Sequence, residues 1–128
     1  MSEIVFDTSA LLALLNREPG HEEVARTIPQ AVVSTVNLSE VVAKLVESSM
    51  PGEAIREALD GLVLKVHAFE RDLAYESGLL RTATRSRGLS LGDRACLALG
   101  HRLNLPVLTT DRVWEGLEVG VEVRLARS

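Results

Sequence analysis

The sequence predicts a single α/β domain in which helices cover both faces of a small central parallel sheet. Short apolar, β-branched runs alternate with longer segments of helical periodicity, which is typical of parallel strands joined by right-handed crossovers. The chain of 128 residues is long enough to bury one core, so we assign residues 1–128 to one domain. Hydrophobic residues make up 46% and charged residues 25%, which excludes a disordered or disulfide-built chain.

The expected strands are five short runs rich in Val, Ile and Leu. They are residues 4–6, 31–33, 62–66, 106–108 and 119–125. The first four are separated by segments of helical periodicity, which places their carboxyl ends at one edge of the sheet.

The expected helices have recognisable ends. They cover residues 8–15, 20–28, 36–49, a segment starting at Pro51, residues 70–87 and residues 90–103. Asn16 and Pro19 close the first helix, and Gly88 follows the helix over residues 70–87. Ser90 and Asp93 have the spacing of a capping box at the start of the last helix.

The charge and the cysteine content limit which partners and which cellular compartment are expected for this protein. The formal net charge is −4, which argues against a broadly basic surface for nucleic acid. Cys96 is the single cysteine, so no disulfide forms within the chain. The first residues lack a basic segment followed by a long apolar one, and no run approaches a membrane span. We expect a cytoplasmic protein that does not associate with a membrane.

Four acidic residues stand at the carboxyl edge of the predicted sheet. Asp7 ends the first strand, Asp111 ends the fourth, Glu40 lies one turn into the helix after the second strand, and Asp93 lies in the first turn of the last helix. Ligands of open parallel sheets bind in the crevice beyond this edge. Each acid also has a structural explanation, because Asp7, Asp93 and Asp111 suit helix caps or turns and Glu40 can pair with Lys44.

Clustered carboxylates repel one another unless protons or a cation compensate their charge. Oxygen ligands without a convergent His or Cys favour Mg²⁺ or Mn²⁺ over zinc. These ions complete their shell with water and substrate phosphates, so the pattern points to phosphodiester hydrolysis.

Four segments resemble segments that occur in the same order in PIN-domain ribonucleases, and within that family the closest resemblance is to toxins of the VapC type. They are residues 7–12 (DTSALL), 34–42 (STVNLSEVV), 89–95 (LSLGDRA) and 108–111 (LTTD). The resemblance covers essentially the whole chain. It implies a central parallel sheet, dependence on Mg²⁺ or Mn²⁺, endonucleolytic cleavage of an RNA substrate, and a cognate antitoxin that blocks the site.

Carried over by position, the resemblance makes Asp7, Glu40, Asp93 and Asp111 the catalytic and metal-binding quartet. It adds Thr8, Ser9 and Thr110 as candidate hydrogen-bonding partners of these acids. We expect Asp7 and Asp93 to hold the principal metal, Glu40 to bind it or orient the attacking water, and Asp111 to act through water or a second ion.

Two arginines and the apolar helices suggest further contacts. Arg94 and Arg112 each follow an acid and are candidate phosphate contacts, although an ordinary surface position explains them as well. The resemblance and the Leu-rich helices together predict a homodimer that also binds the antitoxin.

Other enzyme classes fit the residues less well. A haloacid-dehalogenase-like phosphatase requires an Asp where Ser9 stands, and a receiver domain requires a Lys late in the sheet, whereas the only lysines are Lys44 and Lys65. Neither a G-x-x-x-x-G-K-[ST] loop nor a G-x-G-x-x-G turn is present. The remaining alternative is a PIN-like module that binds a protein or RNA partner without cutting.

Overall fold

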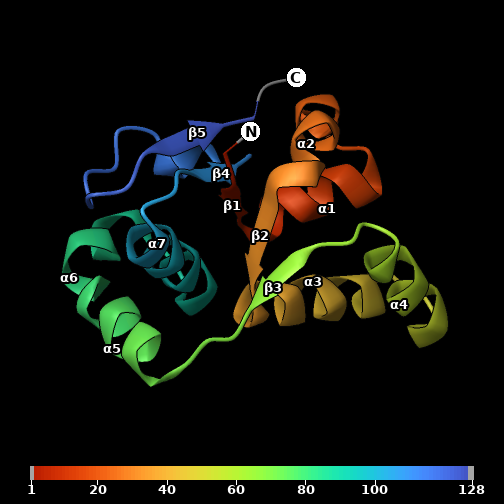
Figure 1. The fold of residues 1–128 in the computed structure, drawn as a ribbon, viewed down its shortest axis with the longest axis horizontal. Coiled ribbons are helices and arrows are strands. Elements are labelled where there is room, and N and C mark those ends of the chain that lie inside the picture. Colours follow the sequence, from red (N-terminus) through yellow and green to blue (C-terminus); the bar gives the residue numbers. More distant parts are fainter. Residues whose placement is uncertain (1, 127–128) are drawn as a thin grey trace.

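Residues 2–126 of the computed structural model are described, and they form one five-stranded sheet with helices on both faces (Figure 1). The strands are β1 (Ile4–Phe6), β2 (Ala31–Ser34), β3 (Lys65–His67), β4 (Val107–Thr109) and β5 (Val123–Leu125). Every strand pair is parallel, and the order across the sheet is β3-β2-β1-β4-β5. The predicted fold class is therefore confirmed. The assignment of residues 1–128 to one domain extends to residues 1, 127 and 128, which lie outside the described part.

The helices lie in the connections between these strands and pack on the two faces of the sheet. The α-helices are α1 (Thr8–Asn16), α2 (His21–Thr27), α3 (Thr35–Glu47), α4 (Gly52–Asp60), α5 (Arg71–Leu79), α6 (Arg81–Thr84) and α7 (Leu91–Leu103), with 3₁₀ helices η1 (Ile28–Gln30), η2 (Arg85–Arg87) and η3 (Arg112–Trp114). Among residues 2–126, no helix combines the length and apolar content needed to cross a bilayer.

Alternate side chains of the central strands point to opposite faces of the sheet, so the core has two halves. Phe6 and Val33 belong to a cluster that packs against α1, α2, α3 and α4. Val5 and Val32 belong to the other cluster, which packs against α5 and α7. Figure 1 shows α1 to α4 on one side of the strands and α5 to α7 on the other. Because side chains pack on both faces of β1, Asp7, which follows this strand, is held in a fixed position.

Two strands begin later than the apolar runs predicted. The run at residues 62–66 becomes a strand only at Lys65, because Leu62 donates its N–H to Leu59 and closes the end of α4. Val63 then takes a left-handed conformation with φ of 53°. The run at residues 119–125 becomes a strand only at Val123, because Gly120 has a φ of 76° and bends the chain before it.

The helix predicted over residues 70–87 is divided into α5, α6 and η2. The buried Thr84 hydroxyl donates to the carbonyl of Leu80 at 2.8 Å, a contact that bends helices. Gly88 ends the segment with a φ of 67°, as its position predicts.

Candidate active site

A pocket of about 320 Å³ lies beyond the carboxyl ends of β1 and β4. It is lined by all four predicted acids together with seven other residues, and the full set is Asp7, Thr8, Ser9, Leu12, Glu40, Ala43, Lys44, Glu47, Ser90, Asp93 and Asp111. The adjacent positions of β1 and β4 place Asp7 near Asp111, while α3 and α7 bring in Glu40 and Asp93. The tertiary structure thus brings together four acids that are far apart in the sequence.

Asp7 is the most deeply buried of these acids, with 2% of its surface exposed. Its carboxylate accepts hydrogen bonds from the Ser9 hydroxyl at 2.8 and 2.9 Å, the Ala10 N–H at 2.8 Å and the Thr109 hydroxyl at 2.5 Å. Burial raises the pKa of Asp7 from 3.8 to about 7, the three hydrogen-bond donors oppose this rise, and the charge of Asp93 adds to it. Without a cation, Asp7 therefore holds a proton until close to neutral pH.

The hydroxyl groups around Asp7 also connect β1 to the segment after β4. Ser9 Oγ accepts a hydrogen bond from the Thr110 N–H at 3.0 Å, and Thr109 Oγ1 accepts one from the Asp111 N–H at 3.0 Å. Of the predicted partners, Ser9 acts through its hydroxyl, whereas Thr110 contributes its backbone N–H. Thr109 was not among the residues predicted from the sequence. Its position at the end of a buried strand, two residues before Asp111, could have identified it as a candidate.

Glu40 is fixed by side chains of α1 and α3. The Thr8 hydroxyl donates to Glu40 Oε1 at 2.6 Å, and the buried Asn37 amide lies 3.5 Å from the same oxygen. The carboxylate rests against the first turn of α7, where a Cβ added to Gly92 would fall 2.1 Å from Glu40 Oε1. Neither Asn37 nor Gly92 was predicted from the sequence to belong to the site.

Asp93 and Asp111 act as helix caps in this structure. Asp93 Oδ2 accepts from the Ser90 N–H at 2.9 Å, and Ser90 Oγ accepts from the Asp93 N–H, which completes the predicted capping box. Asp111 Oδ1 accepts from the Val113 N–H at 3.0 Å and caps η3. Capping uses one oxygen of each carboxylate. Within residues 2–126, no hydrogen bond reaches Asp93 Oδ1 or Asp111 Oδ2, so the structural explanation leaves an oxygen of each acid available.

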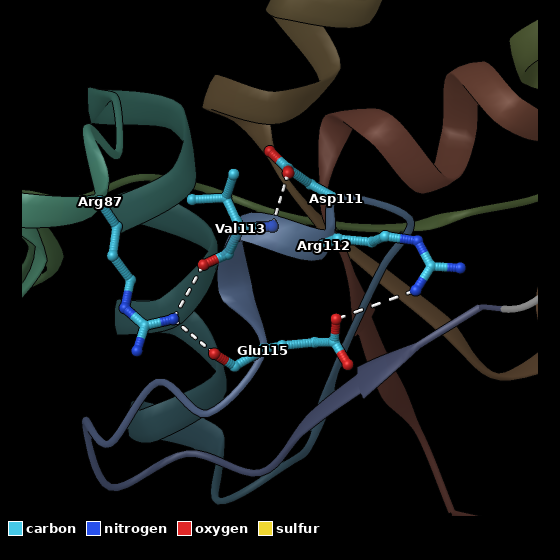
Figure 2. Close-up of polar contacts among 5 residues, drawn as sticks. All are labelled: Arg87, Asp111, Arg112, Val113 and Glu115. Carbon is cyan, nitrogen blue, oxygen red and sulfur yellow. Dashed lines mark hydrogen bonds and ion pairs between the residues drawn. The ribbon is translucent and has the colours of Figure 1, made fainter.

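The turn that carries Asp111 is held by a cation from η2. Figure 2 shows the Arg87 guanidinium donating to the carbonyls of Val113 at 2.9 Å and Glu115 at 2.5 Å. The same view shows Arg112 beside Glu115, with 3.9 Å between Arg112 Nη1 and Glu115 Oε1. Arg87 thus ties η2 to η3 and limits where Asp111 can lie.

The basic residues near the pocket differ in what they contact. Arg94 turns toward α5, where its Nη1 donates to the carbonyl of Ser77 at 3.1 Å. Lys44 lines the pocket itself and lies 3.7 Å from Glu47 in an exposed ion pair. Of the two predicted phosphate contacts, Arg94 is thus engaged with the protein, while Arg112 lies exposed beside Asp111.

The donor chemistry of the pocket suits a hard divalent cation. Its acidic lining offers carboxylate oxygens alone, without His or Cys, and this set favours Mg²⁺ or Mn²⁺. In the described part of the chain, no three acidic, His or Cys side chains are already gathered into a metal site. The pocket therefore supplies suitable ligands but not a preassembled coordination shell.

Comparison with known proteins places the chain in a family. A family model described as PIN domain matches residues 4–119. No curated protein sequence matches the chain significantly. Among solved structures, DNA-bound VapBC from Salmonella typhimurium has a TM-score of 0.75 at 20% identity, covering 97% of this chain and 98% of that one.

Two structures from Mycobacterium tuberculosis are also similar. VapC20, described as a Sarcin-Ricin loop cleaving toxin, has a TM-score of 0.71 at 19% identity, covering 94% of this chain and 99% of that one. VapBC-5, from a family of toxin-antitoxin systems, has a TM-score of 0.64 at 21% identity, covering all of both chains. At these identities the structures show a shared fold. The family match over most of the chain shows that this protein belongs to the PIN domain family.

Proposed function

We propose that this protein is a Mg²⁺- or Mn²⁺-dependent endoribonuclease and the toxin of a toxin-antitoxin pair. The observation that carries the proposal is that Asp7, Glu40, Asp93 and Asp111 line one pocket at the carboxyl edge of the sheet. PIN nucleases generally use divalent metals. The similarity in fold to a toxin that cleaves the Sarcin-Ricin loop supports RNA as the substrate class.

The four acids have different parts in this proposal. Asp7 and Asp93 would hold the principal ion, Glu40 would bind it or orient the attacking water, and Asp111 would act through water or a second ion. A bound ion supplies hydroxide near neutral pH and neutralises charge on the leaving oxygen. Ser9, Ala10 and Thr109 keep the Asp7 carboxylate in one orientation, which reduces the reorganisation needed when a cation and substrate bind.

Basic side chains at the rim would contact the RNA backbone. Lys44 lines the acidic pocket and Arg112 follows Asp111, so both can approach a phosphate held there. Arg94 is directed toward the Ser77 carbonyl and is therefore the weaker candidate for a phosphate contact. The chain has four aromatic residues, and this small number favours recognition of RNA shape and backbone over base stacking.

The surface also offers places for the two protein partners in the proposal. An apolar groove of about 380 Å³ lies along α3, α4 and the start of β3, and Leu38, Ile55 and Leu64 are among the residues lining it. On α5, Tyr75 and Leu79 are 70% and 80% exposed. Such apolar surfaces support binding of an antitoxin and of a second copy of the chain. Several similar structures are themselves toxin-antitoxin complexes.

The proposed activity is tested by incubating the purified protein with RNA in Mg²⁺, Mn²⁺ or EDTA. We expect cleavage with either metal, none in EDTA, and products with 5′-phosphate ends, since a metal-generated nucleophile needs no 2′-hydroxyl. Asp7→Asn should abolish cleavage, and Asp72→Asn should not, because Asp72 is exposed and lies outside the acidic pocket. Full activity in EDTA, or 2′,3′-cyclic phosphate ends, would refute the mechanism.

The same experiment separates the enzyme from a non-catalytic interaction module. Such a module would bind RNA or a protein without cutting under any metal condition. Sedimentation tests the assembly, because the proposal predicts a dimer and a larger complex with an antitoxin. A strictly monomeric protein, with activity unchanged by any neighbouring gene product, would count against it.

A further inference from the structure

Asn37 is a fully buried polar residue in α3, one turn before Glu40. Its amide nitrogen contacts three acceptors from three separate segments: the Thr8 hydroxyl at 3.0 Å, the Gly92 carbonyl at 3.1 Å and Glu40 Oε1 at 3.5 Å. The side chain therefore joins α1, α3 and α7 directly behind Thr8 and Glu40, which line the acidic pocket.

The neighbours determine which way the Asn37 amide faces. The Gly92 carbonyl and the Glu40 carboxylate can only accept hydrogen bonds. The Thr8 hydroxyl gives its hydrogen to Glu40 Oε1 at 2.6 Å, so it presents a lone pair to Asn37. An amide oxygen in this place would face three acceptors, so the amide nitrogen, with its two N–H groups, must point toward them.

The other end of the Asn37 amide shows that stability alone does not explain the residue. Asn37 Oδ1 is buried, and nothing in the described part of the chain donates a hydrogen bond to it. A buried acceptor without a partner destabilises the folded state. A local loss of stability of this kind is expected at a functional site. In Asn37 the amide nitrogen makes the hydrogen bonds, and the amide oxygen makes none within the described part of the chain.

Gly92 provides the space in which the Glu40 carboxylate rests. A Cβ at Gly92 would lie 2.1 Å from Glu40 Oε1 and 2.4 Å from both Cδ and Oε2. The carboxylate is thus in contact with Thr8, Asn37 and the first turn of α7. Asp93 is the next residue of that turn, so the contact between Asn37 and Gly92 also sets where Asp93 lies relative to Glu40.

We propose that Asn37 is a positioning residue, which holds the Glu40 carboxylate against Gly92, next to Asp93, so that Glu40 and Asp93 can converge on a divalent cation when one binds. The inference rests on the proposed function, since it concerns the same acidic pocket. It assigns a specific role to a residue that carries no charge and does not line the pocket.

Removing the Asn37 amide should weaken cation binding. Groups that orient metal-binding side chains typically contribute roughly 10- to 100-fold in metal affinity or activity. We therefore expect Asn37→Ala to raise the Mn²⁺ concentration for half-maximal cleavage, and the dissociation constant for Mn²⁺ measured by calorimetry without RNA, by at least about tenfold.

Gly92→Ala should displace the same Glu40 carboxylate, through a steric clash and not through loss of a hydrogen bond. The atoms that an added Cβ would meet are the far end of the flexible Glu40 side chain, which can move away without unfolding the helix. Alanine is also a better helix former than glycine. This variant should fold as well as the parent protein and still bind Mn²⁺ at least about tenfold more weakly, because the displaced Glu40 carboxylate can no longer reach an ion held by Asp93.

Two matched controls separate positioning from general loss of stability. Thr84→Val removes a buried hydroxyl that bonds to the Leu80 carbonyl outside the pocket. Gly78→Ala adds a methyl group in α5, where nothing lies within 4 Å of it. Both controls should keep the parent affinity for Mn²⁺, with folding checked by circular dichroism and thermal melting.

The outcomes distinguish this inference from the proposed function. If the parent protein neither binds Mn²⁺ nor cuts RNA, the proposed function fails and the inference fails with it. If the parent does both, and Asn37→Ala binds Mn²⁺ as tightly as Thr84→Val does, only the positioning role is refuted. If Asn37→Ala does not fold, Gly92→Ala decides, and an affinity equal to that of Gly78→Ala overturns the inference.

Discussion

Raising the pH should destabilise this protein in the absence of metal, and Asp7 is the reason. Burial raises the pKa of Asp7 from 3.8 to about 7. Between these values the folded protein holds a proton that the unfolded chain has released, so increasing pH favours unfolding. One pKa unit corresponds to about 1.4 kcal/mol, so the full loss of unfolding free energy is about 4 kcal/mol, of which about 3 kcal/mol falls between pH 5 and pH 8.

The assay is urea unfolding at a series of pH values from 5 to 8, in EDTA and again in Mg²⁺. In EDTA the free energy of unfolding should fall steadily over this range. In Mg²⁺ the fall should be smaller, because a cation that binds the ionised pocket stabilises the folded state by about 2.7 kcal/mol at a hundredfold excess over its dissociation constant.

Two variants assign the effect to one residue. Asp7→Asn cannot titrate and should flatten the pH dependence in EDTA. Asp72→Asn removes an exposed carboxylate at the start of α5 and should leave the slope unchanged. Stability that is constant or rises from pH 5 to pH 8 in EDTA, or a slope that persists in Asp7→Asn, would refute the reasoning.

Three further predictions concern stability and the turns around the site. Above pH 7, where Asp7 is ionised, Asp93→Asn should melt no lower than the parent in EDTA, because the lost charge at the start of α7 is offset by less repulsion between positions 93 and 7. It should also cut RNA at least about a hundredfold more slowly; equal destabilisation in EDTA and in Mg²⁺ with normal cleavage would reduce Asp93 to a cap. Arg87→Ala should lower the free energy of unfolding by roughly 1 to 2 kcal/mol and slow cleavage, since it releases the turn beside Asp111, and urea unfolding with an unchanged midpoint would contradict this. Gly100→Ala should cost about 1 to 3 kcal/mol despite the better helix propensity of alanine, because the added Cβ would lie 2.7 Å from Val107 Cγ1; a thermal melt no lower than that of the parent would show that the core can adapt.

The pattern of the chain predicts the fold class and the four acids because both depend on local features. Alternating apolar runs and helical stripes indicate parallel strands, and the carboxyl ends of parallel strands meet at one edge. The position of Asp7 directly after β1 and the capping box at Ser90 are likewise properties of short segments. The same argument predicts Asp93 as either a cap or a site residue, and the structure shows that one carboxylate can cap the helix and also face the pocket.

Other features depend on residues that meet only when the chain folds. The late start of β3 and the division of the segment over residues 70–87 follow from hydrogen bonds at Leu62 and Thr84 that outweigh periodicity. One of the three hydrogen-bond donors to Asp7 is Thr109, which is 102 positions away in the sequence.

The surroundings of Glu40 were decided by tertiary structure alone. An Asn in an amphipathic helix and a Gly in a first turn are ordinary in sequence, and their significance arises when α1, α3 and α7 converge on one carboxylate. Sequence periodicity and caps determined which acids face the edge of the sheet, because these are local properties of strands and helices. Which neutral groups hold those acids in place was determined by packing between distant segments, because a hydrogen bond or a close approach requires both partners to be present in space.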